Sequence, residues 1–256
     1  MREPMDTDIA AADRVLHVLA VLARAPQALS AVELVQATGL PRSSLYRQLT
    51  RLKRFGLIQE HAGQYAPGPL SLQLAMGFER ESNLVRIARP YLVQLSQATQ
   101  ESAALIVPAN GQALCLAMAE SPQSLRCSFA QGRSVPLQRG ASALCLLAHL
   151  PEPDRNAILV QQHGPHAGVL TAVQTHLRQI RETGYVITSG EVDAGVWGCS
   201  VPLFGAGRRA VAALTLMAPQ QRVSDQQPQW LQHTLTAAAR ISRALTEDLS
   251  PTPSLS

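Results

Sequence analysis

Positive charge is concentrated in one short part of this 256-residue chain. Residues 34–59 contain five cations and no acid, although the net charge of the whole chain is only +4. The five are Arg42, Arg47, Arg51, Lys53 and Arg54. Cations grouped in this way can contact the phosphates of a nucleic acid, and the guanidinium of arginine can also bond two acceptors of a guanine. The grouping therefore indicates a polyanionic partner for this part of the chain.

The surrounding sequence predicts the helices that must position these cations. Apolar residues recur at helical spacing over residues 8–24, which predicts a first helix. Ser30 and Glu33 form the pattern of a capping box at the start of a second helix, and Gly39 suits the left-handed turn that would end it. Pro41 suits the first position of a third helix. The cations all lie on that third helix.

The predicted third helix has an apolar face and a polar, cationic face. Leu45, Leu49 and Leu52 recur at helical spacing, so they would form the buried stripe. We expect the opposite face to contact DNA, because an α-helix fits the major groove of B-DNA. The candidate DNA-contacting residues are Arg42, Ser43, Ser44, Tyr46, Arg47, Thr50, Arg51 and Arg54. The alternative is a solvated helix face without a partner.

These candidates would have different roles on DNA. Arg47 is the expected base contact, because its fork can bond both O6 and N7 of guanine, with Tyr46 and Thr50 as secondary candidates. Ser43 and Ser44 stand in the first turn, where free backbone amides could bind a phosphate, and we expect them to position the helix. The remaining cations would contact the DNA backbone.

A short β-hairpin is expected after the third helix. The runs "LIQE" and "QYAP" are extended in character and are separated by "HAG". Helices followed by such a hairpin predict a winged helix-turn-helix over residues 8–68. Apolar residues then continue at helical spacing, and we expect a linker helix over residues 69–82.

The rest of the chain predicts an α+β domain over residues 83–249. A helix is expected over residues 84–99, and Asn110-Gly111 between two apolar runs predicts a hairpin. Downstream, helices and strands alternate without a regular βαβ rhythm, which favours an antiparallel sheet. A last helix is expected over residues 225–247, and residues 250–256 are predicted to be a disordered tail.

Composition and motifs exclude several other classes of protein. The four cysteines lie far apart among apolar residues, no signal-peptide pattern opens the chain, and no apolar run is long enough to cross a membrane. These features predict a cytoplasmic protein without membrane contact. "GAGRRA" at 205–210 matches a dinucleotide motif but is followed by a strand, and His163 and His166 lack a third ligand. We therefore expect neither a cofactor nor a metal.

Several segments in the same order resemble the IclR family of bacterial transcriptional regulators. The segment "ALSAVELVQATGLPRSSLYRQLTRLKRFGLIQE" resembles the DNA-binding domain of that family. Further along, "SVPLQRGASALCLLAHLP", "RETGYVITSGEVDAGVWGCSVPLF" and "AALTLMAPQQRVS" look like its effector-binding domain. Together these segments extend over about residues 8–247. The resemblance implies a winged helix-turn-helix, a linker helix and a GAF-like α+β domain that binds a small organic effector.

The resemblance also implies partners and a mode of action. Members of the family bind palindromic operators in double-stranded DNA as dimers or as dimers of dimers, and neither a cofactor nor catalysis is implied. For a two-fold dimer, half-sites about one helical turn apart are expected. Binding of a small organic acid or aromatic catabolite changes operator affinity. Repression is the expected effect, because a bound dimer blocks polymerase without any further contact.

By position, the effector pocket of the family falls on residues scattered through the second half of the chain. These are Ala141, Ser142, Thr188, Gly198, Thr215 and Met217. Thr188, Gly198 and Met217 stand where members that bind very small acids have more polar groups. This loss of polar lining and gain of space indicates a bulkier, less polar ligand, such as an aromatic acid.

Four further residues of this domain have two readings each. Trp197 could stack on a ligand or simply pack in the core. Met118 could reach the pocket from the second strand of the Asn-Gly hairpin, or belong to the core. Glu191 and Asp193 could position a loop or take a ligand hydroxyl, or do neither.

Two other functions stay open on the sequence alone. The C-terminal domain could be an enzyme that acts on a small molecule in its cavity, although no serine or cysteine has a recognisable base partner. The chain could also be a redox-sensing regulator, in which oxidation of Cys115, Cys127, Cys145 or Cys199 changes DNA affinity. The apolar surroundings of these cysteines count against that reading.

Overall fold

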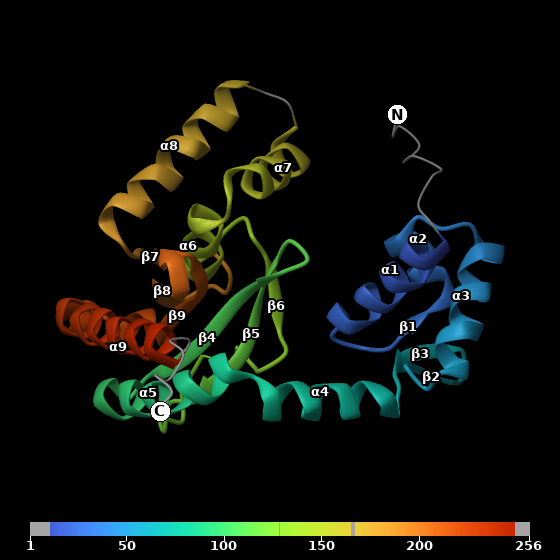
Figure 1. Ribbon diagram of the computed structural model, residues 1–256, viewed down its shortest axis with the longest axis horizontal. Helices are drawn as coiled ribbons and strands as arrows, with labels where there is room; N and C mark the ends of the chain where they lie inside the picture. Colours follow the sequence, from blue (N-terminus) through green and yellow to red (C-terminus); the bar gives the residue numbers. More distant parts are fainter. Residues whose placement is uncertain (1–10, 128, 165–166, 249–256) are drawn as a thin grey trace, which may run out of the picture. The chain divides into compact units, whose positions relative to one another are not determined.

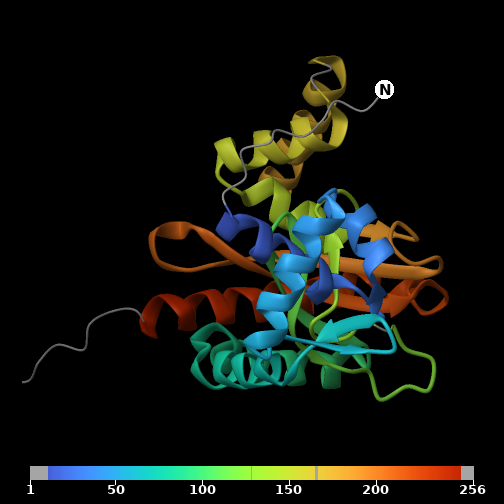
Figure 2. The same ribbon diagram turned by 90° about the vertical axis from the view of Figure 1, so that its right-hand side faces the viewer.

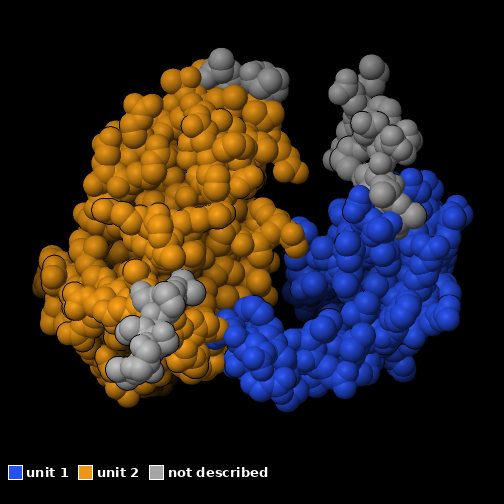
Figure 3. Space-filling view, in the orientation of Figure 1, with its two compact units in different colours: residues 1–82 blue, residues 83–256 orange. Residues whose placement is uncertain are grey.

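The computed structural model describes residues 11–127, 129–164 and 167–248 (Figure 1). The chain divides into two compact units, Met1–Ser82 and Asn83–Ser256, which Figure 3 colours separately. Each unit has a hydrophobic core of its own, and each is described by itself below. The proposed tail at 250–256 lies outside the described residues, as do the first three residues of the helix expected over 8–24.

Three helices form the core of the first unit. They are α1 Ala11–Arg24, α2 Ala31–Thr38 and α3 Arg42–Arg54. Leu22, Leu34, Leu45 and Leu49 are each at most 1% exposed and meet at the centre of this unit. The predicted leucine stripe of α3 is therefore confirmed, and Leu52 lies in the same core.

The predicted capping box of α2 is present. The Oγ of Ser30 accepts a hydrogen bond from the Glu33 amide, and the Glu33 carboxylate accepts one of 2.7 Å from the Ser30 amide. Gly39 ends the helix with φ of 67°, in the left-handed region that glycine tolerates. The prediction for Pro41 was wrong by one residue. Pro41 is extended, with ψ of 145°, and stands before α3, which begins at Arg42.

A small antiparallel sheet completes the DNA-binding part of the unit. Its strands are β1 Leu29–Ser30, β2 Ile58–His61 and β3 Gln64–Pro67, in the order β1-β3-β2. Ala62 and Gly63 both have positive φ, which matches the twist of a tight hairpin. The predicted wing is confirmed, whereas β1 was not predicted. The helix α4 Pro69–Glu81 follows the wing.

A six-stranded antiparallel sheet is the centre of the second unit (Figure 1). The strands are β4 Ser102–Ala109, β5 Gln112–Ala119, β6 Ser134–Pro136, β7 Val186–Ser189, β8 Val196–Phe204 and β9 Ala210–Pro219. Their order is β6-β5-β4-β9-β8-β7. Asn110 and Gly111 both have positive φ in the turn between β4 and β5, so the predicted hairpin is confirmed.

Helices cover both faces of this sheet (Figures 1 and 2). The helices α5 Asn83–Thr99 and α9 Gln227–Asp248 pack together on one face, and α6 Ala141–His149 packs on the other. The helices α7 Glu152–His163 and α8 Ala167–Thr183 follow α6, and α8 packs against it. Each face of the sheet has its own apolar core. The predicted α+β class is confirmed.

Short 3-10 helices join the last elements of the second unit. They are η1 Ala206–Arg208, η2 Gln220–Arg222 and η3 Ser224–Gln226. The first one connects the antiparallel strands β8 and β9, so "GAGRRA" is a hairpin connection, as predicted, and no helix follows it. His163 ends α7, while His166 lies outside the described residues. Within the described residues, no group of three metal-binding side chains comes together, and no helix is long and apolar enough to span a membrane.

Candidate DNA interface and effector pocket

The outward face of α3 carries nearly all of the candidate DNA-contacting side chains. The exposed ones are Arg42, Ser43, Tyr46, Arg47, Thr50, Arg51 and Arg54. Because α3 begins at Arg42, the amides of its first turn have no partner within the helix, and Leu45 is the first to donate, to the Pro41 carbonyl. This end of α3 therefore combines free amide donors with exposed cations, as a phosphate site requires.

Ser44 is a correction to the predicted interface. Its residue is only 5% exposed, and its Oγ lies inside the unit beside the buried Leu45 and Gln48. At 100° per residue, Ser44 begins a buried arc of about 140° that ends at Leu49. The side chain of Ser44 is therefore not on the outward face, although its amide still belongs to the first turn.

The cations of α3 differ in what they already contact. Lys53 bonds the Glu60 carboxylate on β2, and this hydrogen bond raises the pKa of Lys53. Arg51 donates to the side-chain oxygen of Gln48 at 3.3 Å. Among the described residues, Arg42, Arg47 and Arg54 have no ion pair or side-chain hydrogen bond. These three arginines are therefore the cations of α3 that remain available to a partner.

A cavity opens in the second unit between the sheet, the start of α6 and the loop before β8. Its empty volume is about 560 Å³, part of it open to solvent. Six of the predicted pocket residues line it, namely Ala141, Ser142, Thr188, Gly198, Thr215 and Met217. The other lining residues include Ile106, Cys127, Phe129, Val135 and Val196. The cavity is thus mostly apolar, with a few polar groups at one end.

The polar end of the cavity is the N-terminus of α6. The amide of Gly140 donates to the Glu191 carboxylate at 2.7 Å, and the amide of Ala141 donates to the Thr188 hydroxyl at 3.0 Å. The next two amides of this helix, at positions 142 and 143, have no hydrogen-bond partner among the described residues. An acceptor in the cavity could therefore bond them and lie in the favourable field of the helix N-terminus.

An acidic loop, residues 190–195, borders the cavity. Gly190 and Gly195, at its two ends, both have positive φ. Glu191 holds the loop to α6 through the Gly140 amide, and Asp193 pairs with Arg133 at 3.4 Å. Of the two readings of Glu191 and Asp193, the structure supports loop positioning.

Trp197 and Met118 are corrections to the predicted pocket. Trp197 is 2% exposed and lies 5.8 Å, ring to ring, from Trp230 of α9, on the opposite face of the sheet. Successive residues of a strand point to opposite faces, so Gly198 faces the cavity and Trp197 cannot. Met118 packs against the core on the cavity side without lining the cavity. Both residues therefore have a packing role.

Some wall residues were missed because the sequence offers little signal for them. Ile106, Phe129, Val135 and Val196 look like ordinary strand or core residues, and they meet only when distant segments fold together. Their apolar, β-rich runs predicted strands correctly. Which of them border an open space depends on packing that no short pattern encodes.

The thiols of the second unit are all buried. Burial raises the pKa of Cys127 to about 11 and those of Cys115 and Cys199 to about 12, and it also raises the pKa of Cys145. Thiols with such pKa values stay protonated at neutral pH, and the thiolate is the form that reacts with oxidants. These pKa shifts count against the redox-sensing alternative.

The comparison with known proteins agrees with both sites. Residues 11–62 match the model of the IclR helix-turn-helix domain, and residues 79–243 match that of the bacterial transcriptional regulator IclR C-terminal domain. The chain belongs to the IclR family. It is therefore a DNA-binding transcriptional regulator.

Three relatives illustrate the range of this family. The chain is 26% identical to the HTH-type transcriptional regulator KipR of Bacillus subtilis, over 83% of this chain and 88% of that one. It is 24% identical to the transcriptional repressor IclR of Escherichia coli, over 87% and 84% of the two chains. A crystal structure of an IclR homolog from Microbacterium hydrocarbonoxydans, complexed with 4-hydroxybenzoate, has a TM-score of 0.69, 23% identity, and coverage of 92% and 99%. The last similarity supports the fold.

The contact between Gly140 and the acidic loop leads to a stability prediction. Gly140 has φ of 89°, and an added Cβ would collide with Cγ2 of Val192. Gly140→Ala should therefore lower stability by about 1–3 kcal/mol through backbone strain, and further through the collision. Gly132, with φ of 84° and open space around it, provides the matched control Gly132→Ala.

Thermal unfolding of the two variants separates these causes. Gly140→Ala should lose more stability than Gly132→Ala, and adding Val192→Ala should recover part of the difference. Equal losses in both variants, without recovery, would show that Val192 does not press on this helix end.

Proposed function

We propose that this protein represses transcription by binding a palindromic operator through α3, and that a small, moderately apolar acid in the C-terminal cavity changes its affinity for DNA. The observation that carries the first part is the outward position of Arg47 beside Arg42 and Arg54. All three arginines are exposed, while the leucines behind them fix the orientation of the helix.

The geometry of α3 assigns each group a role on DNA. With α3 in the major groove, the Arg47 fork can bond guanine O6 and N7, and Tyr46 and Thr50 lie on the same exposed face. The hydroxyl of Thr50 also bonds the Tyr46 carbonyl at 2.9 Å, which directs its methyl group outward as an apolar contact. Arg42 and Arg54, at the two ends of α3, would contact phosphates, and the first-turn amides would add a further phosphate contact.

Substitution of Arg47 tests the base contact. Arg47→Ala should weaken binding to the preferred duplex by about 1–3 kcal/mol and relax the preference at one base pair, because a bidentate contact is lost. Lys53→Ala is the matched control, since Lys53 already bonds Glu60 on the protein. The measurement is a fluorescence titration with a duplex that the wild-type protein selects from a random pool, and with a scrambled duplex. Equal losses on both duplexes for Arg47→Ala would refute the base contact.

The apolar surface of α4 supports self-association. No residue of α4 is buried, although four large apolar side chains lie on it. They are Leu72, Leu74, Met76 and Phe78, each more than half exposed. A contiguous exposed apolar surface of this kind is typical of a protein–protein interface. We propose that it forms part of a two-fold dimer interface, which would match the symmetry of a palindrome. Such dimers could assemble further into tetramers.

Charge placed on α4 tests this dimer. Leu74→Asp should convert the dimer to a monomer at micromolar concentration, because an unpaired carboxylate would be buried in the interface. Gln73→Asp introduces the same charge at the neighbouring exposed polar position and should leave the dimer intact. Sedimentation velocity measures both variants. A Leu74→Asp protein that sediments as the wild type would exclude α4 from the interface.

The chemistry of the cavity supports a moderately apolar acid as the effector. Ile106, Phe129 and Met217 offer an apolar surface of the size that an aromatic ring needs, and the amides of α6 offer donors for a carboxylate. No lysine or arginine lines the cavity among the described residues, so a dianion would lack a counter-charge. The Microbacterium homolog was crystallised with an aromatic acid, which is consistent with this proposal.

We propose that the cavity binds its ligand without converting it. The relatives KipR and IclR are named as a transcriptional regulator and a repressor, which supports regulation rather than catalysis. The chromosomal DNA that such a regulator binds lies in the bacterial cytoplasm, and we propose that compartment for this chain.

A thermal-shift screen tests the effector proposal. Benzoate, 4-hydroxybenzoate and a series of short-chain acids would be added to wild-type protein. A ligand at one hundred times its dissociation constant should add about 2.7 kcal/mol of stability. In Gly198→Val, whose side chain projects into the cavity, the shift should disappear. Gly198→Ala is the milder control, because its Cβ would make an ordinary 3.5 Å contact with Ala141. A shift that persists in Gly198→Val would place the ligand elsewhere.

A further inference from the structure

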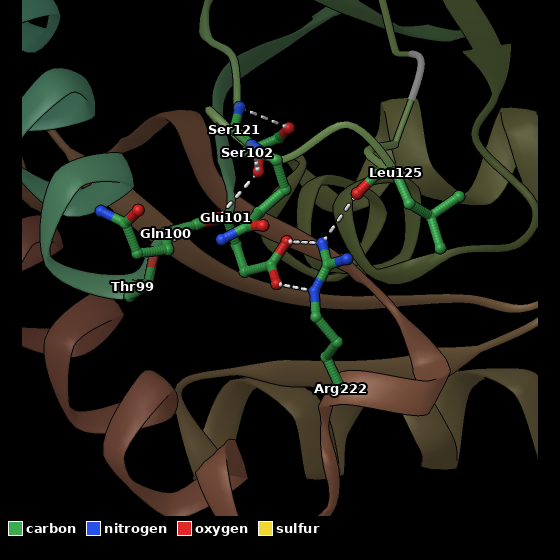
Figure 4. A network of polar contacts seen from close by, with 8 residues as sticks. Thr99, Gln100, Glu101, Ser102, Ser121, Leu125 and Arg222 are labelled. Atoms are coloured by element: carbon green, nitrogen blue, oxygen red, sulfur yellow. Dashed lines mark hydrogen bonds and ion pairs between the residues drawn. The ribbon is translucent and has the colours of Figure 1, made fainter.

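A buried carboxylate lies at the junction between α5 and β4. Glu101 is 2% exposed, and a buried charge is costly unless it is paired and hydrogen-bonded. Its partner is Arg222 of η2, whose Nε and Nη2 bond the two carboxylate oxygens at 2.5 and 2.7 Å (Figure 4). Such a forked pair fixes both the position and the plane of the guanidinium.

The same guanidinium also contacts a loop that leads to the effector cavity. Nη2 of Arg222 donates to the Leu125 carbonyl at 3.0 Å (Figure 4). Leu125 belongs to the wall loop, defined here as residues 120–127, which follows β5. This loop ends at Cys127, which lines the cavity, and Phe129 lies just beyond it. Arg222 therefore joins the cavity wall to the α5–β4 junction.

The wall loop has a second attachment at its beginning. The hydroxyl of Ser121 donates to the Gln100 carbonyl at 2.7 Å, and the Ser121 amide donates to the Ser102 hydroxyl at 3.1 Å. Further along the loop, between residues 123 and 127, the bond from Arg222 to Leu125 is the one hydrogen bond to another element among the described residues. The part of the loop nearest the cavity thus depends on Arg222.

The surroundings of Cys127 place this ion pair close to the cavity. Burial raises the pKa of the Cys127 thiol, the charge of Glu101 raises it further, and the charge of Arg222 lowers it. Both members of the pair are therefore near enough to act on a side chain that lines the cavity.

We propose that Arg222 is a positioning residue for the effector pocket, and that it holds the wall loop, with Cys127 and Phe129, against the buried Glu101. This proposal rests on the proposed effector function of the cavity. Arginine is required because its fork satisfies both oxygens of Glu101 and still has a donor for Leu125. The shorter reach and single nitrogen of lysine would keep the charge pair but not all three bonds.

Hydrogen–deuterium exchange of the full-length protein tests the hold on the loop directly. In Arg222→Lys, the amides of residues 122–127 should exchange at least tenfold faster than in the wild type, while α6 and α9 are unchanged. Arg126→Gln is the matched control, because Arg126 lies on the same loop but pairs with Glu120 at the exposed surface. It should change exchange in this loop less than twofold. Arg222→Gln should exceed Arg222→Lys, and if it does not fold, the lysine variant decides.

Ligand titration adds a readout that a purely structural role would not change. An acid that stabilises the wild type, with benzoate and 4-hydroxybenzoate as probes, should bind Arg222→Lys at least fivefold more weakly and Arg126→Gln normally. If neither acid binds the wild type, the effector proposal in its present form fails, while the exchange measurement still decides the role of Arg222. Faster exchange confined to the wall loop upholds that role. Unchanged exchange, or acceleration throughout the second unit, overturns it.

Discussion

The burial of the leucine stripe along α3 determines what the DNA-binding unit can present to a partner. Leu45, Leu49 and Leu52 pack against α1 and α2, and each buried leucine contributes about 1.5–3 kcal/mol. Because residues on a helix are 100° apart, anchoring one side fixes the direction of every other side chain. The outward position of Arg47 is thus a consequence of packing. The capping box at Ser30 and the hairpin behind α3 hold the same orientation from either side.

Local chemistry in the sequence predicted most of the fold. The turn at Asn110-Gly111 and the left-handed Gly39 follow from backbone preferences that act within a few residues. The misses come from effects that a short window does not contain. Ser44 is buried because the packed arc of α3 extends beyond its leucines, and Trp197 faces α9 because strand register decides its side of the sheet. Strands as short as β1 and β6 exist only through pairing with distant segments.

The effector cavity was predicted at the level of position and not of composition. Residues at the start of α6 and along β8 and β9 were placed by resemblance to a family, and the structure brings them to one cavity. Its apolar wall comes from segments far apart in sequence, including the loop that Arg222 fastens to Glu101. A buried ion pair of this kind contributes little net stability compared with apolar packing, and its value lies in geometry. Position-specific contacts of this type are visible only in three dimensions.

The alternation of β8 has a consequence for how such regulators diversify. Gly198 borders the ligand space, while its neighbours Trp197 and Cys199 belong to the core beneath α9. Substitutions at the first kind of position reshape the binding site, and those at the second kind set the cohesion of the domain. Since one strand keeps the two duties on opposite sides, evolution can retune what the receptor recognises one residue at a time, without putting the integrity of the scaffold at risk.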